Sequence, residues 1–239
     1  KKILIGYDRR FMADAFAKEI VPFVNGCGFV PILSNSYVTT PACSFYAKEM
    51  NFLGALVITA SHNPYNWLGL KIKSFDGCSV DESFTSEIEK RLLLGNAIHK
   101  LEVPYEIANV KKLHLEKIKS LFNIDFISDT LIKMNMRIFV DAMHGSAAKC
   151  IAEIFDYKGL KLIQGIREDS DPFFGGNPPE PLYQYLGVLT QKLSTNKKNG
   201  MRNLGIIFDG DGDRIAVIDE KGRYCSTQDL LPYFISYLG

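Results

Sequence analysis

Short apolar runs rich in β-branched residues alternate with helix-length amphipathic stretches along most of the 239-residue sequence. This alternation is typical of α/β proteins, in which helices pack on a central sheet. In the first half of the chain we expect strands at 2–7, 29–33, 56–59 and 70–74. Helices are expected at 12–24, 41–50 and 82–94. The second helix would begin at Pro41, because proline loses nothing at the first helical position, with Thr40 as its cap.

A second α/β series follows a weakly periodic region between residues 95 and 123. We place a domain boundary near residue 125, which gives domains 1–125 and 126–239. In the second domain, strands are expected at 137–140, 160–163, 204–208 and 215–218, and helices at 147–155, at 182–193 and from 227. The Pro/Gly-rich stretch 169–181 should be a loop, and the polar run 194–203 a solvated turn.

The composition excludes several classes of function. The 28 lysines and arginines balance 27 acidic residues, so a net charge of +1 gives no bulk electrostatic reason to bind nucleic acid or anionic membrane. No apolar run approaches the roughly 18 residues that span a bilayer, and no signal-peptide pattern is present. The five scattered cysteines predict reduced, mostly buried thiols. We therefore expect a folded cytoplasmic protein without nucleic-acid or membrane partners.

A polar loop follows the expected strand 56–59 and contains Ser61, His62 and Asn63. In α/β proteins, ligand-binding groups lie outside the carboxyl ends of strands, so this loop suits chemistry. An acyl hydrolase is disfavoured because the Gly-x-Ser-x-Gly elbow is absent. Two alternatives stay open: a polar turn that bonds its own backbone, or a reactive serine faced by the ammonium of Lys71 in the next strand. Lys71 could also be an ordinary surface lysine.

An acidic loop between two apolar strands is the strongest signal in the sequence. Asp209, Asp211 and Asp213 alternate with glycines, so three carboxylates can converge on one hard cation. Magnesium suits such a set, with a phosphate oxygen or water completing its shell, and Arg214 could contact that phosphate. A solvated acidic turn is the plain alternative. A calcium EF-hand is disfavoured, since Arg214 occupies its glycine position, although Glu220 falls at its twelfth position.

Together the two loops resemble those of the α-D-phosphohexomutases, the phosphoglucomutase and phosphomannomutase family. Segment 59–64 resembles the phosphoserine loop, 69–71 the end of the active-site lysine segment, and 209–214 the metal loop. Weaker similarities occur in the family's order at 6–10, 40–41, 141–145 and 171–181. The resemblance implies two consecutive α/β domains, each a mixed sheet flanked by helices. It also implies interconversion of hexose 1-phosphate and hexose 6-phosphate, with glucose or mannose as the sugar.

The resemblance further implies a role for each matched residue. Ser61 would carry the phosphoryl group, and Mg²⁺ would bind the three aspartates and a phosphoserine oxygen. Lys71 or His62 would move the hydroxyl proton, with Lys71 favoured. Arg9, Arg214 and Asn63 would contact the phosphate or substrate, and glucose 1,6-bisphosphate would be the activating intermediate.

Departures from the family pattern are equally informative. Trp67 and Leu68 stand where the family often has Tyr-Asn, and Lys1 is not an initiator methionine. The family's opening Gly-Thr-Asp-Gly-type segment and the sugar and distal phosphate loops of its third and fourth domains are not found. We therefore expect the first two of four domains, with the C-terminal domains as missing partners and little turnover by this chain alone. The rivals are a magnesium-dependent phosphatase or other phosphotransferase, a non-catalytic metal-binding module, and a structural or interaction fragment.

Overall fold

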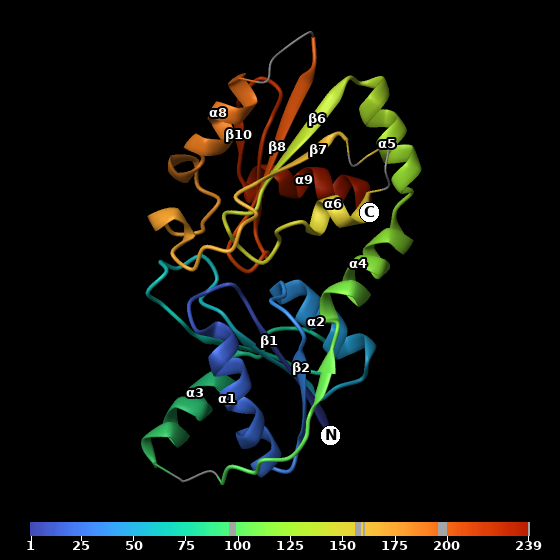
Figure 1. Cartoon of the computed structure of the whole chain (residues 1–239). Coiled ribbons are helices and arrows are strands. Elements are labelled where there is room, and N and C mark those ends of the chain that lie inside the picture. Colours follow the sequence, from blue (N-terminus) through green and yellow to red (C-terminus); the bar gives the residue numbers. More distant parts are fainter. Residues whose placement is uncertain (96–98, 156–158, 160, 196–199, 239) are drawn as a thin grey trace. The chain divides into compact units, whose positions relative to one another are not determined.

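The computed structural model describes residues 1–95, 99–155, 159, 161–195 and 200–238 (Figure 1). By its internal contacts the chain forms two compact units. Unit 1 comprises Lys1–Ala60 and Leu68–His114, and unit 2 comprises Ser61–Trp67 and Leu115–Gly239. The short segment Ser61–Trp67 therefore belongs to unit 2, although it lies inside the sequence of unit 1.

Unit 1 is a five-stranded mixed sheet in the order β4-β3-β1-β2-β5. All neighbours are parallel except β4, which runs antiparallel to β3. The strands are β1 Lys2–Tyr7, β2 Val30–Ser34, β3 Gly54–Ile58, β4 Leu70–Lys73 and β5 Glu106–Ala108. The helices are α1 Ala13–Gly26, α2 Thr40–Glu49, α3 Glu82–Leu93 and α4 Val110–Leu121, the last of which contains the division between the units.

Helices cover both faces of this sheet because successive strand residues point to opposite sides. Leu4 and Ile5, next to each other on β1, are both fully buried. Leu4 packs in a cluster with Ala42 of α2, and Ile5 packs in another with Ala17 of α1. Unit 1 is therefore a three-layer α/β/α structure.

Unit 2 is also a five-stranded mixed sheet, in the order β10-β9-β8-β6-β7. The pairs of β6 with β7 and β8 are parallel, and those of β9 with β8 and β10 are antiparallel. The strands are β6 Met136–Asp141, β7 Ile163–Ile166, β8 Arg202–Phe208, β9 Ile215–Ile218 and β10 Tyr224–Cys225. The helices are α5 Ile124–Lys133, α6 Cys150–Ile154, α8 Gly187–Thr195 and α9 Thr227–Leu238, with 3₁₀ turns η1 Phe174–Gly176 and η2 Tyr183–Tyr185.

The core of unit 2 follows the same alternation along β6, an inner strand between β8 and β7. Phe139 packs with Leu189 of α8, whereas Val140 packs with Leu131 of α5. Among the described residues, no helix combines the length and apolar character needed to cross a bilayer. The expected fold class, two α/β domains with mixed sheets flanked by helices, is confirmed.

Several sequence-based element predictions need correction. The strand expected at 160–163 begins only at Ile163, because β7 takes its register from pairing with β6, where Ile163 faces Ile138; residue 160 lies outside the described residues. The helix expected at 182–193 starts at Gly187, after η2, and the helix expected at 147–155 is α6.

The cap of α2 and the polar run near residue 200 also differ from expectation. Thr39, rather than Thr40, caps α2 by accepting the N–H of Ala42. Much of the expected turn at 194–203 lies outside the described residues; α8 includes Ser194 and Thr195, and β8 starts at Arg202. The domain boundary near residue 125 remains a sequence-based proposal.

Candidate functional site

The acidic loop joins two antiparallel strands, β8 and β9. Asp209 Oδ1 accepts the N–H groups of Asp213 and Arg214, each at 3.0 Å, so the first carboxylate organises the turn that follows it. Gly212 has a φ of +72°, a conformation that glycine adopts without strain. Because strands rather than helices flank the loop, an EF-hand is excluded.

Three carboxylates converge in this loop. Asp209, Asp211 and Asp213 each offer an oxygen within 4.8 Å of the others. Asp209 and Asp211 are fully buried, and Asp213 is exposed. Burial, together with the charges of Asp211 and Asp213, raises the pKa of the Asp209 carboxyl to about 8. A hard divalent cation with oxygen ligands would neutralise this repulsion, so the donor set fits Mg²⁺.

Ser61 lies directly against the acidic loop within unit 2. Its hydroxyl donates to Asp209 Oδ2 at 3.2 Å, its side chain is buried, and its φ is +55°. A β-carbon at Gly210 would lie 2.6 Å from the Ser61 carbonyl oxygen, so the two backbones touch at a position that accepts no side chain. The structure thus brings together the serine and the aspartates that the sequence places 148 residues apart.

A second loop, after β6, supports the acidic loop. Ser146 donates its N–H to the Gly210 carbonyl at 2.9 Å, and a β-carbon at Gly145 would lie 2.6 Å from the same oxygen. At the end of β6, the fully buried Asp141 accepts two hydrogen bonds from the Arg167 guanidinium, at 2.9 and 2.6 Å. This buried pair fixes the loop on which the acidic loop rests.

Three charged or titratable side chains meet beside the serine. Glu180 Oε1 lies 3.7 Å from His62 Nε2 and 3.8 Å from Arg214 Nη1. A cavity of about 360 Å³, lined also by Tyr224 and Gln228, opens next to Glu180 and Arg214. Glu180 was not among the residues predicted to be functional, although it stands in the proline-rich segment noted as a weak similarity.

The remaining predicted residues occupy separate places. Asn63 is half-buried in the serine loop of unit 2. Arg9 is buried in unit 1, where its guanidinium group donates to the Tyr37 hydroxyl and its central carbon lies 3.9 Å from the Tyr37 ring centroid. Lys71 is half-buried on β4 and pairs with Val57 of β3. Because Arg9 and Lys71 belong to unit 1, their roles toward Ser61 stay predictions.

Both units match models of known protein domains. Residues 1–96 match the family model of phosphoglucomutase/phosphomannomutase α/β/α domain I, and residues 112–222 match domain II. The chain belongs to the phosphoglucomutase/phosphomannomutase family. This membership confirms the family expected from the serine and acidic loops, and it agrees with the α/β/α layering of unit 1.

Members of the phosphoglucomutase/phosphomannomutase family with different sugar names resemble the chain to similar extents. Phosphoglucosamine mutase of Bdellovibrio bacteriovorus is 27% identical over 239 residues, which cover 97% of this chain and 49% of that protein. Phosphoglucomutase 1 of Drosophila melanogaster is 28% identical over 267 residues, covering 99% of this chain and 47% of that protein. The chain thus spans about half the length of these relatives.

Solved structures of the same family show the same fold. A structure that carries the name of a phosphomannomutase from Thermus thermophilus has 28% sequence identity and a TM-score of 0.80. That match covers 93% of this chain and 49% of the other chain. Since the relatives are named for glucosamine, glucose and mannose, they do not select one sugar.

Proposed function

We propose that this chain supplies the phosphoserine and metal-binding half of a phosphohexomutase. The observation that carries the proposal is the hydrogen bond from Ser61 Oγ to Asp209, inside a cluster of three aspartates. A hydroxyl that can accept phosphate, placed on a divalent-cation site, is the arrangement that phosphoryl transfer requires. Bound Mg²⁺ would supply charge neutralisation for the transferred group, held by Asp209, Asp211 and Asp213.

The proposed reaction moves one phosphoryl group between Ser61 and a sugar hydroxyl. The Ser61 O–P bond breaks as the sugar O–P bond forms, and the sugar hydroxyl proton passes through a nearby base to the freed Ser61 oxygen. Lys71 is our first candidate for that base and His62 the second. Arg214, exposed beside the acidic loop, would contact phosphate oxygens, with Arg9 and Asn63 as further contacts.

The proposed substrates are hexose phosphates, interconverted through a sugar bisphosphate such as glucose 1,6-bisphosphate. The sequence favours glucose or mannose and leaves glucosamine open, and relatives named for all three sugars support keeping the three as candidates. We propose that the remaining half of the relatives' length holds the sugar, so this chain alone should show little turnover. The rival phosphatase would instead release inorganic phosphate.

Phosphopeptide mapping of residues 59–71 tests the proposal directly. The chain is incubated with glucose 1,6-bisphosphate and MgCl₂, and phosphate is located by mass spectrometry. We expect one phosphate on Ser61, none in Ser61→Ala, and little without magnesium. Rapid release of inorganic phosphate would favour the phosphatase. An unlabelled Ser61 would leave metal binding alone and favour a non-catalytic metal-binding module.

The proton carrier can be tested with a matched pair on β4. Lys71 and Lys73 lie two residues apart on that strand, and Lys73 Nζ donates to Ser79 Oγ at 2.8 Å. Lys71→Met should slow labelling of Ser61 by about 100-fold, the lower range for loss of a general acid or base, whereas Lys73→Met should not. If His62→Asn slows labelling and Lys71→Met does not, the role passes to His62.

A further inference from the structure

A proline-rich turn, residues 178–181, is anchored at both ends within unit 2. Gly210 of the acidic loop donates its N–H to the Pro179 carbonyl at 3.0 Å. Tyr224 of β10 donates its hydroxyl to the Pro181 carbonyl at 2.6 Å. The three prolines of the turn have fixed φ angles, so its backbone has little conformational freedom to lose. Any side chain that projects from this turn is therefore attached to a backbone of restricted conformation.

The side chain it presents is Glu180, and a single carboxylate oxygen faces both functional loops. Glu180 Oε1 lies 3.7 Å from His62 Nε2, next to Ser61, and 3.8 Å from Arg214 Nη1, next to Asp213. Both distances are too long for direct hydrogen bonds: Arg214 forms an ion pair with Glu180, and the His62 ring lies beside the same carboxylate oxygen. The Glu180 side chain is 24% exposed, so water screens it only in part.

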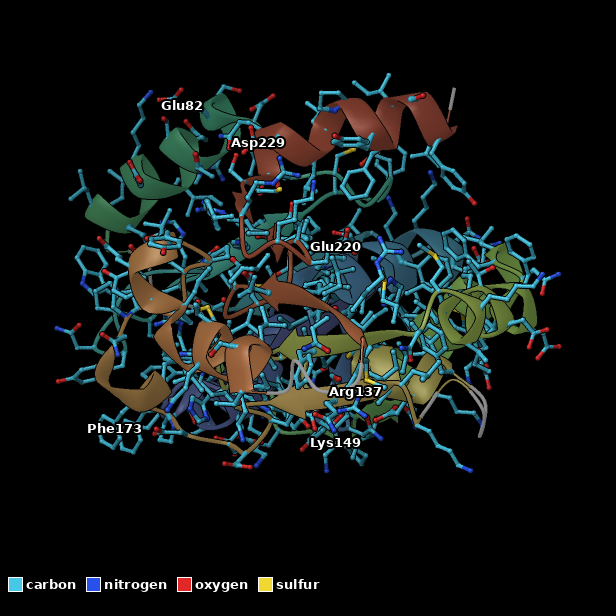
Figure 2. The ribbon with its side chains drawn as sticks, turned by 90° about the horizontal axis from the view of Figure 1, so that it is seen from above. Glu82, Arg137, Lys149, Phe173, Glu220 and Asp229 are labelled. Carbon is cyan, nitrogen blue, oxygen red and sulfur yellow. The ribbon has the colours of Figure 1, made fainter. Side chains whose placement is uncertain are left out.

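Besides the hydrogen bond of Ser61 to Asp209, the serine loop has an aromatic contact within unit 2. Tyr65 packs edge-on against Phe173, with ring centroids 5.2 Å apart; Phe173 is labelled in Figure 2. That contact holds the far part of the loop but does not reach Ser61. Around His62, the Nδ1 atom is buried and lacks a hydrogen-bond partner among the described residues. The other ring nitrogen, Nε2, is the one that lies beside Glu180.

We infer that Glu180 is a positioning residue: it holds the serine loop, residues 61–67, in register with the acidic loop, and so sets how fast Ser61 exchanges phosphate. The inference rests on the proposed phosphoserine function. In the step concerned, the O–P bond of a sugar bisphosphate breaks and the Ser61 O–P bond forms. The Ser61 hydroxyl proton ends on the departing sugar oxygen. Small displacements of a reacting group slow such transfers strongly. A loosened serine loop should therefore lower the rate at which Ser61 is phosphorylated.

Hydrogen–deuterium exchange tests the positioning without any chemistry. In Glu180→Gln, which keeps the shape and removes the charge, peptides within 61–67 should exchange about threefold faster, as expected for loss of a partly exposed contact with a carboxylate. Glu220→Gln is the matched control, because Glu220, labelled in Figure 2, also pairs with an arginine of unit 2, Arg202, which lies at the opposite end of β8 from the acidic loop. The control should leave exchange in 61–67 unchanged.

The labelling reaction supplies the functional readout. With glucose 1,6-bisphosphate and MgCl₂, Glu180→Gln should lower the maximal rate of Ser61 labelling several-fold. The bisphosphate concentration at half-maximal rate should stay the same, because Glu180 acts through the loops and not on the donor. Glu180→Asp, which keeps the charge on a shorter side chain, should recover part of the rate.

The outcomes separate this inference from the proposed function. Exchange in 61–67 that is equal in wild type and Glu180→Gln overturns the inference, as does labelling at the wild-type rate. If the wild-type chain is not labelled, that result counts against the proposed function. Hydrogen–deuterium exchange alone then tests whether Glu180 positions the serine loop. If Glu180→Gln does not fold, the wild-type chain is measured in about 1 M NaCl, where charges are screened beyond about 3 Å. Unchanged exchange of 61–67 in that salt overturns the inference.

Discussion

Ser61 Oγ donates to Asp209 Oδ2 at 3.2 Å, so the hydroxyl that we propose to carry phosphate already contacts a fully buried member of the candidate metal site. The contact joins a loop after β3 to a loop after β8. It places the proposed reactive oxygen and the candidate cation ligands in one compact unit, which would shorten the rearrangement needed before the proposed phosphoryl transfer.

Asp209→Asn should abolish stabilisation by magnesium while leaving the metal-free fold in place. Asparagine keeps an oxygen for the N–H groups of Asp213 and Arg214 but removes one of three negative charges. With MgCl₂ at about 100 times its dissociation constant, wild type should gain about 2.7 kcal/mol in free energy of unfolding, and Asp209→Asn very little. Thermal unfolding with MgCl₂ or EDTA measures this gain, with exposed Asp129→Asn as the control. If MgCl₂ raises the free energy of unfolding of Asp209→Asn as much as that of wild type, the assignment of Asp209 as a metal ligand is contradicted.

Gly210→Ala should separate the serine loop from the acidic loop. The new β-carbon would lie 2.6 Å from the Ser61 carbonyl oxygen and 2.8 Å from Pro179 Cγ, so one backbone must move. We expect a loss of about 1–3 kcal/mol in free energy of unfolding, as for other overpacked sites, and weaker magnesium binding. Urea unfolding and magnesium titration measure both. Gly187→Ala, at the start of α8 with no atom within 4 Å of the new carbon, should be neutral or stabilising.

Arg167→Met should destabilise unit 2 strongly because it leaves the Asp141 carboxylate buried without its cation. Arg167 donates two hydrogen bonds to Asp141, which is fully buried. Breaking such a pair from one side costs about 3–5 kcal/mol. The double variant Asp141→Asn/Arg167→Met, which removes both charges, should lose less than Arg167→Met alone in urea unfolding. If the two variants lose the same free energy of unfolding, Arg167 does not stabilise unit 2 by compensating the charge of Asp141.

His114 should make the stability of unit 1 sensitive to acid. Burial lowers the pKa of His114 below its ordinary value of 6.5, and its ring lies 5.6 Å from that of Phe45. As the pH falls below about 6.5, the unfolded chain binds a proton that the folded chain still excludes. The free energy of unfolding should then fall by up to about 1.4 kcal/mol per pH unit, whereas above that pH this histidine contributes no slope.

The variant His114→Gln isolates this contribution. Between about pH 7.5 and about pH 5.5, its free energy of unfolding should fall less than that of wild type, because the linkage to the buried imidazole is gone. His99→Gln changes an exposed histidine of the same unit and should keep the wild-type slope. Urea unfolding at both pH values makes the comparison. Identical slopes in wild type and His114→Gln would refute the assignment.

Strands were predictable where an apolar run coincides with burial on both faces. The bounds expected for β1 are those observed, and its adjacent Leu4 and Ile5 are both fully buried. In contrast, β5 has three residues, of which Glu106 and Ile107 are exposed, so its sequence shows no apolar pattern. Helix α4 was not predicted because charged residues dilute its apolar period, whereas α5 keeps a clear apolar face that the prediction did not include. Short edge elements take their structure from pairing rather than from local pattern.

The candidate site shows the same contrast. Ser61 and the three aspartates stand in loops directly after strands, where the sequence pattern of an α/β protein locates ligand groups. Glu180 could not be found in this way, because its contacts with His62 and Arg214 join three distant segments with no spacing rule between them. Its only local signal was the surrounding prolines.

The segment Ser61–Trp67 belongs to unit 2 while both its neighbours in sequence belong to unit 1. The chain therefore changes unit three times, after Ala60, before Leu68 and after His114. A single cut in the α4 helix would give one piece that bears Ser61 without its aspartates and another that bears the aspartates without a serine. A chimera that exchanged only one of these pieces between two relatives would combine the serine of one parent with the acidic loop of the other. The proposed nucleophile and the candidate metal ligands therefore stay together in a chimera only when residues 61–67 are exchanged together with unit 2.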